Sequence, residues 1–179
     1  MSSKAVILLF LVPIILLRSC SYGGSRMLYN NDDKIADARL EQVVEVINNE
    51  DKEALKAMFS KQALDEAEDF DARIDSLFNL TKGDVGSWRR TGLSSDESNH
   101  YGTKEKMLRS WYTIITSEGE YTFLLIEYTR DDEHSENVGL YMLRVSKAGE
   151  SGGTWQDTLC AGINMLLDTS EQDAIENTD

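Results

Sequence analysis

Proline, cysteine and histidine are scarce in this chain of 179 residues, which contains one, two and two of them, respectively. A single proline excludes a collagen-like or proline-rich chain. Two cysteines are too few for a disulfide scaffold or a four-cysteine zinc site. Basic side chains are also in deficit, 18 against 32 acidic ones, which gives a net charge of −14. Because phosphate binding depends on clustered Lys and Arg, this balance argues against nucleic acid as a partner.

The rest of the composition is that of a globular protein, with 41% hydrophobic and 28% charged residues. The length fits one domain of roughly 100–200 residues with a leader or tail. We expect four segments in chain order: a lipoprotein signal peptide over 1–19, a flexible tether over 20–31, an α+β domain over 32–167 and an acidic disordered tail over 168–179.

The leader begins with Lys4 and an unbroken apolar run of 13 residues, Ala5 to Leu17. A helix of this length spans about 20 Å, whereas a bilayer core is about 30 Å thick. The run therefore has the length of a secretory signal sequence rather than of a permanent membrane span.

Leu17-Arg18-Ser19-Cys20 follows the apolar run and resembles a bacterial lipobox, with Arg18 at a position where a small residue is usual. The resemblance implies a diacylglyceryl group on the Cys20 thiol and cleavage before Cys20. Since two acyl chains are enough for stable anchoring, we expect a protein that the membrane holds through Cys20, at the extracellular face of the cell. An uncleaved anchor helix, or a signal peptide with a coincidental cysteine, is the alternative. Cys160 then lacks a partner, and we expect it to be buried.

The first part of the domain has helical periodicity. Asp32 and Asp33 suit a helix start, and Asn48-Asn49 suits its end. Between them, apolar residues recur at spacings of three and four, as one face of a helix requires: Leu40, Val43, Val44 and Ile47. Asp51 or Glu50 starts a short second helix. Ser60 caps a third, which continues through Phe78 by the same spacing.

From Val85 onward the apolar period changes to two, which predicts strands. The expected strands are 85–91, 104–116, 120–130 and 137–146, and Leu93 to Asn99 is expected to be a polar loop. Helices followed by a meander predict an α+β fold in which N-terminal helices pack on a curved antiparallel β-sheet.

The run from Ile47 to Ser60 is similar to the helix-turn-helix opening of nuclear-transport-factor-2-like domains, which have a cystatin-like cone. The run from Ile74 to Phe78, with Trp88, resembles an uncharacterised Gram-positive lipoprotein family (domain of unknown function 5104). This resemblance implies the cone fold and is silent on activity, because the fold carries many functions. It also implies that the open sheet face can carry a homodimer.

Few residues suggest catalysis or metal binding. His100 lies in a polar loop, and His134 lies in an acidic turn whose side chains are expected to splay outward. No Gly-x-Ser-x-Gly, catalytic-cysteine or phosphate-loop pattern is present. We therefore expect no metal, no cofactor and no catalytic residue.

A cone enzyme would need a carboxylate and a phenol inside the cone. Glu127 shares a strand face with Phe123 and Leu125, and the available phenols, Tyr112, Tyr128 and Tyr141, lie mid-strand. In the alternative interpretation, Glu127 faces solvent or pairs with a strand neighbour such as Arg109 or Arg144.

A second group is aromatic and basic and suits an anionic or sugar ligand: Trp88, Arg89, Arg90 and Trp111. Its alternative interpretation is core packing and local charge balance. From the two groups, six residues are the candidate ligand-binding residues: Trp88, Arg90, Trp111, Tyr112, Glu127 and Tyr128. The leading hypothesis is a non-catalytic module that binds an unknown protein or small-molecule ligand. An isomerase- or dehydratase-like enzyme that uses the cone cavity is the alternative, and a purely structural partner is a third.

Overall fold

A computed structural model describes residues 31–81, 85–148 and 161–166. Several predicted features therefore lie outside the described residues: the signal peptide over 1–19, the tether up to residue 30, Cys20, Cys160 and the tail over 168–179. Within the described part, no helix combines the length and the apolar character needed to cross a membrane.

Four helices come first in the described chain: α1 (Asp32–Asn48), α2 (Lys52–Ala57), α3 (Lys61–Glu66) and α4 (Phe70–Leu80). The first helix begins and ends where the sequence predicts. Its predicted apolar stripe faces the interior, with Leu40, Val43 and Ile47 buried.

Two predicted helix caps are confirmed. The Asp51 carboxylate accepts a hydrogen bond from the backbone N–H of Ala54 at 2.9 Å. The Ser60 hydroxyl accepts one from the N–H of Ala63 at 3.1 Å. Each bond satisfies a backbone donor that has no partner within its own helix, so these two side chains fix where α2 and α3 begin.

The single third helix predicted from Ser60 onward is wrong, because a corner separates α3 from α4. Ala67 is extended there with ψ of 132°, and Asp69 has a positive φ of 50°. Beyond the corner, Phe70 meets Phe59 edge to face with ring centroids 4.9 Å apart. Such a pair contributes about 0.5–1.5 kcal/mol beyond burial, so a tertiary contact outweighs the helical spacing.

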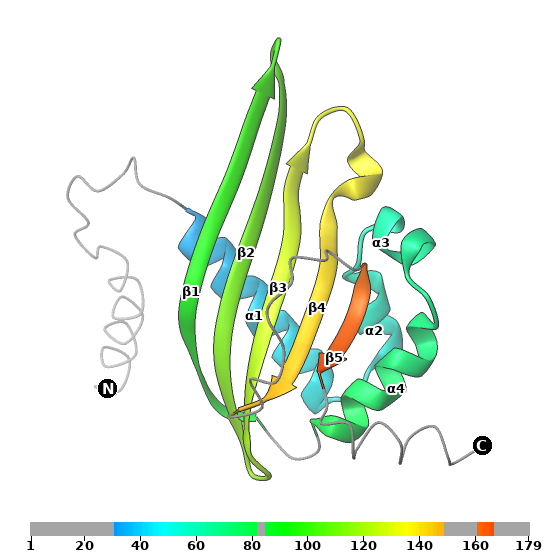
Figure 1. The fold of residues 1–179 in the computed structure, drawn as a ribbon, viewed down its shortest axis with the longest axis vertical. Coiled ribbons are helices and arrows are strands. Elements are labelled where there is room, and N and C mark those ends of the chain that lie inside the picture. The colour runs from blue at the N-terminus through cyan, green and yellow to red at the C-terminus, as the bar shows by residue number, and fades with distance from the viewer. Residues whose placement is uncertain (1–30, 82–84, 149–160, 167–179) are drawn as a thin grey trace, which may run out of the picture. The chain divides into compact units, whose positions relative to one another are not determined.

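Five strands form one open sheet in the order of the chain: β1 (Val85–His100), β2 (Thr103–Thr116), β3 (Glu120–Asp131), β4 (Gly139–Lys147) and β5 (Gly162–Leu166). The first four make an antiparallel meander. The last pair, β4 and β5, is parallel, so the sheet is mostly antiparallel, as predicted, with one parallel pair at its edge. Helices followed by this sheet confirm the α+β class (Figure 1).

The polar loop predicted over Leu93 to Asn99 is also wrong. These residues form the second half of β1, and each pairs with a residue of β2. The two strands join through Tyr101 and Gly102, whose φ angles of 52° and 97° are both positive, as a type I′ hairpin turn needs. Backbone pairing across this tight turn makes a strand of a segment that has no apolar alternation.

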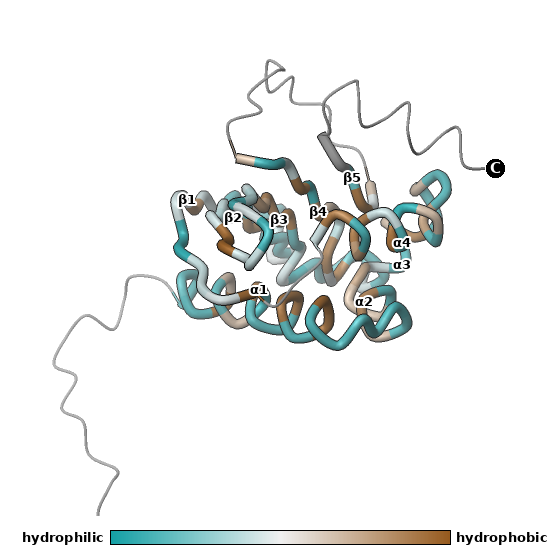
Figure 2. Tube along the Cα trace, turned by 90° about the horizontal axis from the view of Figure 1, so that it is seen from below, coloured by the Kyte–Doolittle hydropathy of each residue, from teal (hydrophilic) through white to brown (hydrophobic). Residues whose placement is uncertain are grey.

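The helices pack on one side of the sheet, which we call the helix face (Figure 2). The main core lies between the helices and the sheet and includes Leu40, Leu55, Ile74, Tyr112, Phe123 and Leu143. Since side chains alternate along a strand, the strand residues next to Tyr112, Phe123 and Leu143 project from the opposite side of the sheet, which we call the outer face. A smaller apolar cluster lies there, formed by Met107, Leu124, Ile126 and Met142.

Candidate functional site

Polar side chains of the helix face fasten α1 to the first two strands. Arg90 of β1 donates hydrogen bonds to the Asp37 carboxylate at 2.6 Å and to the Asp33 carbonyl at 2.9 Å. The Tyr112 hydroxyl of β2 donates to the same Asp37 carboxylate at 3.2 Å. Trp88 packs edge to face on Tyr112, with ring centroids 5.7 Å apart. Three of the six candidate residues therefore meet, but α1 occupies the polar atoms of Arg90 and Tyr112.

Glu127 lies on the same face and is 6% exposed. Its carboxylate accepts a hydrogen bond from Nε of Arg39 in α1 at 2.9 Å and a second, very short one from Nη2 of the same arginine. The predicted face is confirmed, because Glu127 shares it with Phe123 and Leu125. The alternative of a solvent-facing Glu127, or one paired with Arg109 or Arg144, is wrong.

The other two candidates, Trp111 and Tyr128, lie on the outer face and pack against Met107, Leu124 and Ile126. Trp111 is next to Tyr112 in β2, so alternation separates their side chains by the thickness of the sheet. The six candidates thus divide into Trp88, Arg90, Tyr112 and Glu127 on one face and Trp111 and Tyr128 on the other. They do not make one site.

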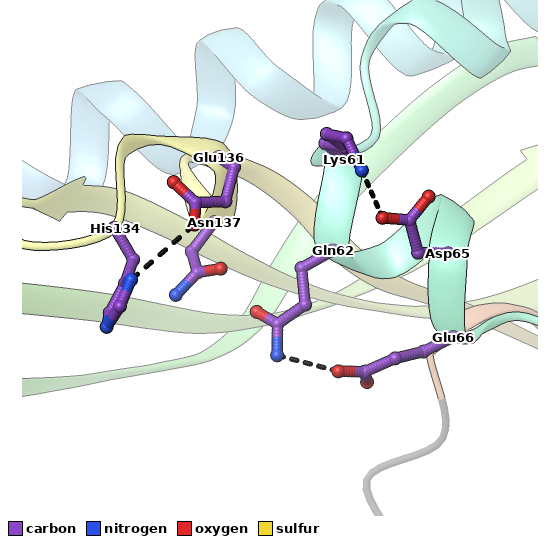
Figure 3. Close-up of a pocket in the computed structure, with 7 residues that line it drawn as sticks. All are labelled: Lys61, Gln62, Asp65, Glu66, His134, Glu136 and Asn137. Carbon is purple, nitrogen blue, oxygen red and sulfur yellow. Dashed lines mark hydrogen bonds and ion pairs between the residues drawn. The ribbon is translucent and has the colours of Figure 1, made fainter.

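A polar groove of about 550 Å³ lies between α3 and the connection from β3 to β4. Two walls line this groove. The first wall consists of Lys61, Gln62, Asp65 and Glu66, and the second wall consists of His134, Glu136 and Asn137. Figure 3 shows the second wall on the short helix η2 (Ser135–Asn137) and the residue before it, facing α3.

Two carboxylates of the groove, those of Glu66 and Asp65, have partners within the fold. Glu66 accepts hydrogen bonds from Gln62 Nε2 at 2.8 Å and from the Tyr141 hydroxyl at 2.7 Å. Lys61 forms an ion pair with Asp65 one turn along α3. The hydrogen bond from Lys61 to the Asp65 carboxylate raises the pKa of Lys61, and the negative charge of Glu136 acts in the same direction. The groove therefore carries three carboxylates and one ammonium group, an excess of negative charge.

Asp131, the last residue of β3, shapes the second wall. Its carboxylate accepts hydrogen bonds from the backbone N–H of His134 at 2.8 Å, the backbone N–H of Glu133 at 3.1 Å and the Asn137 side chain at 2.8 Å. These three bonds, with that of His134 the largest contribution, lower the pKa of Asp131. An ionised Asp131 thus fixes the turn that presents His134 and Asn137 to the groove.

A comparison with protein-family models finds a match to a domain of unknown function (DUF5104) over residues 42–148. This match spans more than half of the chain. The chain belongs to the DUF5104 family. No curated protein matches it. Both walls of the groove lie inside the matched region of this DUF5104 member, and so do the six candidate residues.

In the described part of this DUF5104 protein, no three His, Cys, Asp or Glu side chains are grouped so that they could hold a metal ion. The groove instead offers partly exposed hydrogen-bond donors and acceptors. The side chains of Asp65 and Glu136 are 62% and 52% exposed. Such a surface suits reversible contact with a polar, positively charged partner.

Reasoning from sequence placed His134 and Glu136 in an acidic turn and missed the α3 wall of the groove. About 70 residues separate the two walls in the sequence, so no local pattern connects them. One signal was present. Ser60 caps α3, and Lys61-Asp65 and Gln62-Glu66 are spaced four apart on the exposed side of that helix.

Proposed function

We propose that this protein is an extracytoplasmic lipoprotein whose domain is a non-catalytic binding module, and that the groove between α3 and the β3–β4 connection is its binding site. The observation that carries the proposal is the groove itself, which has a volume of about 550 Å³ and is lined by seven residues that all have polar side chains. Pockets of about 300–1,000 Å³ are typical of ligand sites.

The charge of the groove favours a cationic partner, such as an amine or a lysine-containing segment of a protein. Three carboxylates and one ammonium group line the groove, and the whole chain carries a net charge of −14. Because the carboxylates are exposed, water and salt screen them. We therefore expect weak, rapidly reversible binding that declines as ionic strength rises.

Anchoring through Cys20 is part of the same proposal, and the lipobox-like run Leu17 to Cys20 supports it. A lipid on Cys20 would place the groove at the extracellular face of a cell membrane. The nuclear-transport-factor-2-like cone also belongs here. Helices on one face of an open sheet support it, as do strand bulges next to Arg90, Lys106 and Ile126, because bulges bend strands.

An isomerase- or dehydratase-like enzyme is the less favoured function. It would need Glu127 and a phenol free to reach a substrate. Arg39 engages Glu127, and Asp37 engages Tyr112. These contacts favour a structural role for both side chains, in which they join α1 to the sheet.

The binding proposal is tested with pentalysine as a cationic probe, titrated into the full chain in detergent and followed by calorimetry. The variant Asp65→Asn/Glu136→Gln removes two charges from the groove and is expected to weaken binding at least about tenfold. Glu41→Gln/Glu45→Gln, on the exposed side of α1, removes the same charge elsewhere and is the matched control. Equal affinities of the two variants would contradict the site.

Anchoring is tested separately in a bacterial host by mass spectrometry of the mature N-terminus. We expect diacylglyceryl-cysteine at position 20. The Cys20→Ala variant should move from the membrane fraction to the soluble fraction, because no acyl chain then holds it. An unmodified Cys20 in the membrane fraction would contradict lipidation and leave the groove proposal intact.

A further inference from the structure

The free edge of β1 carries a charge pattern that is complementary to itself. Arg89 and Arg90 precede Leu93 by four and three residues, and Asp96 and Glu97 follow it by three and four. Between them lie only uncharged residues. When two such strands run antiparallel about Leu93, the basic pair of each copy meets the acidic pair of the other.

β1 lies at one end of the strand order, and within the described residues nothing pairs with its second edge. It is 16 residues long, well above the usual five or six. Long exposed edges present backbone N–H and C=O groups that can pair with another chain. Natural edges are protected by proline among other devices, and β1 has no proline.

For two β1 strands to pair about Leu93, the backbone N–H and C=O groups of Leu93 must face the free edge rather than β2. His100 and Thr103 flank the two-residue turn, and such a flanking pair exchanges hydrogen bonds across the hairpin. Hydrogen-bonded and non-hydrogen-bonded pairs then alternate along the ladder. Leu93 is seven residues before His100 without an intervening bulge. Its N–H and C=O groups therefore face the free edge.

The faces of the charged residues also match. Arg89 and Asp96 pair with Thr113 and Met107 of β2, both of which project from the outer face, so Arg89 and Asp96 share that face. A bulge at Thr91 adds one residue between Arg90 and Gly92. With this extra residue, antiparallel pairing about Leu93 sets Arg89 of one copy opposite Asp96 of the other.

Arg89 is exposed and, within the described residues, forms no ion pair, in contrast to Arg90, which α1 engages. Asp96 forms an ion pair with Arg109 of β2 in its own chain, but its side chain is 60% exposed, so its carboxylate is accessible to Arg89 of a second copy as well. We propose that β1 pairs antiparallel with β1 of a second copy of this chain, centred on Leu93 and fixed in register by two symmetric Arg89–Asp96 ion pairs. The result is a dimer with one continuous sheet. This proposal concerns an edge far from the groove and stands independently of the proposed function.

The register is tested by cysteine cross-linking of the full chain in detergent with a short bismaleimide. The two-fold axis at Leu93 brings the two Cα atoms to about 5.5 Å, so Leu93→Cys should give a covalent dimer. Asn99→Cys is the control on the same edge. Asn99 lies six residues from the two-fold axis in each copy, so at 3.3 Å per residue the two sulfurs are about 40 Å apart. This variant should give no more covalent dimer than the unsubstituted chain. Equal yields from the two variants would overturn the proposal.

The ion pairs are tested by sedimentation velocity on charge-reversed chains. Arg89→Glu and Asp96→Lys should each weaken dimerisation at least about tenfold. An equimolar mixture of the two should restore it, because the carboxylate introduced in one chain then meets the ammonium group introduced in the other. Arg73→Glu, exposed on α4, is the control for net charge. Circular dichroism melting curves verify that each variant is folded. A monomeric unsubstituted chain, or variants that dimerise as well as Arg73→Glu, would contradict the proposal.

Discussion

Glu127 of β3 accepts a hydrogen bond from Nε of Arg39 in α1 at 2.9 Å, although 88 residues separate them in the chain. The carboxylate side chain is 8% exposed and the guanidinium side chain 24%. A charge this deeply buried is tolerated when it is paired and hydrogen-bonded. The pair therefore fixes the position of α1 on the helix face.

Arg39→Met should destabilise the protein strongly, because it leaves the Glu127 carboxylate buried without a partner. Removal of one member of a buried pair costs about 3–5 kcal/mol, and the partial exposure of Arg39 points to the lower end of that range. Urea unfolding followed by circular dichroism measures the change. Arg39→Met/Glu127→Leu should be more stable than Arg39→Met alone, because no unpaired charge remains. A double variant as unstable as Arg39→Met would contradict this account.

Tyr112 should make stability sensitive to alkaline pH. Burial raises its pKa from 10.0 to about 12, and the negative charge of Asp37 acts in the same direction. In the unfolded chain Tyr112 loses its proton near pH 10, whereas in the folded protein it keeps it. Stability is therefore fully present below pH 10 and declines as the pH rises from 10 to about 12.

The measurement compares urea unfolding of the unsubstituted chain with Tyr112→Phe at pH 8, 10 and 11.5. At pH 8 the variant should lose about 0.5–1.5 kcal/mol with the hydrogen bond to Asp37. The difference should shrink by pH 11.5, since the variant has no phenol to ionise at that position. A difference that does not change with pH would show that Tyr112 does not contribute this linkage.

Asp131 should make the stability of the protein sensitive to acid pH, whereas Tyr112 makes it sensitive to alkaline pH. Hydrogen bonds from the N–H of His134, the Asn137 side chain and the N–H of Glu133 lower its pKa below the ordinary 3.8. Its contribution to stability is thus present above pH 3.8 and is lost as the pH falls through the folded-state value. Asp131→Asn should be less stable at pH 7 and lose less stability than the unsubstituted chain on going to pH 3. Pentalysine affinity should also fall, because the wall formed by His134 and Asn137 loosens.

Local patterns predicted the first helix, the starts of α2 and α3, and the strand faces correctly. The stripe of Leu40, Val43 and Ile47 and the caps Asp51 and Ser60 act within one or two turns of chain, so short-range physics determines them. Alternation of Glu127 with its neighbours gave the correct face of β3 for the same reason. The corner at Asp69 lies next to a contact between residues distant in sequence, Phe59 with Phe70, and β5 pairs in parallel with β4. No local spacing encodes either feature.

The candidate site was harder to predict, because its residues meet only in the folded chain. Trp111 and Tyr112 are adjacent in sequence yet project from opposite faces of β2. Arg39 was overlooked as the partner of Glu127 because it lies on a helix in a different part of the chain. The groove joins α3 to a turn about 70 residues later. Composition suggests which side chains carry chemistry, and topology determines which of them meet.

Gly139 begins β4 where that strand touches the chain before α3. Ser60 N–H donates to the Leu140 carbonyl at 2.8 Å, and Leu140 N–H donates to the Met58 carbonyl at 2.9 Å. Gly139 has φ of +132°, and a Cβ there would lie 3.0 Å from the Ser60 nitrogen and 3.2 Å from the Met58 oxygen. An alanine would therefore meet both backbone strain and contact with atoms that cannot move independently.

Gly139→Ala should lower the free energy of unfolding by about 2–4 kcal/mol, the sum of the costs of strain and overpacking. Gly102→Ala is the matched control, because its φ of +97° imposes similar strain while its Cβ would meet nothing within 4 Å. Urea unfolding of both variants isolates the contact contribution as their difference, which should be at least about 1 kcal/mol. Pentalysine affinity should decline in Gly139→Ala alone, because the same contact holds α3 beside β4. Equal stability of the two alanine variants would mean that β4 and Ser60 separate readily and that the α3 wall is not fixed to the sheet.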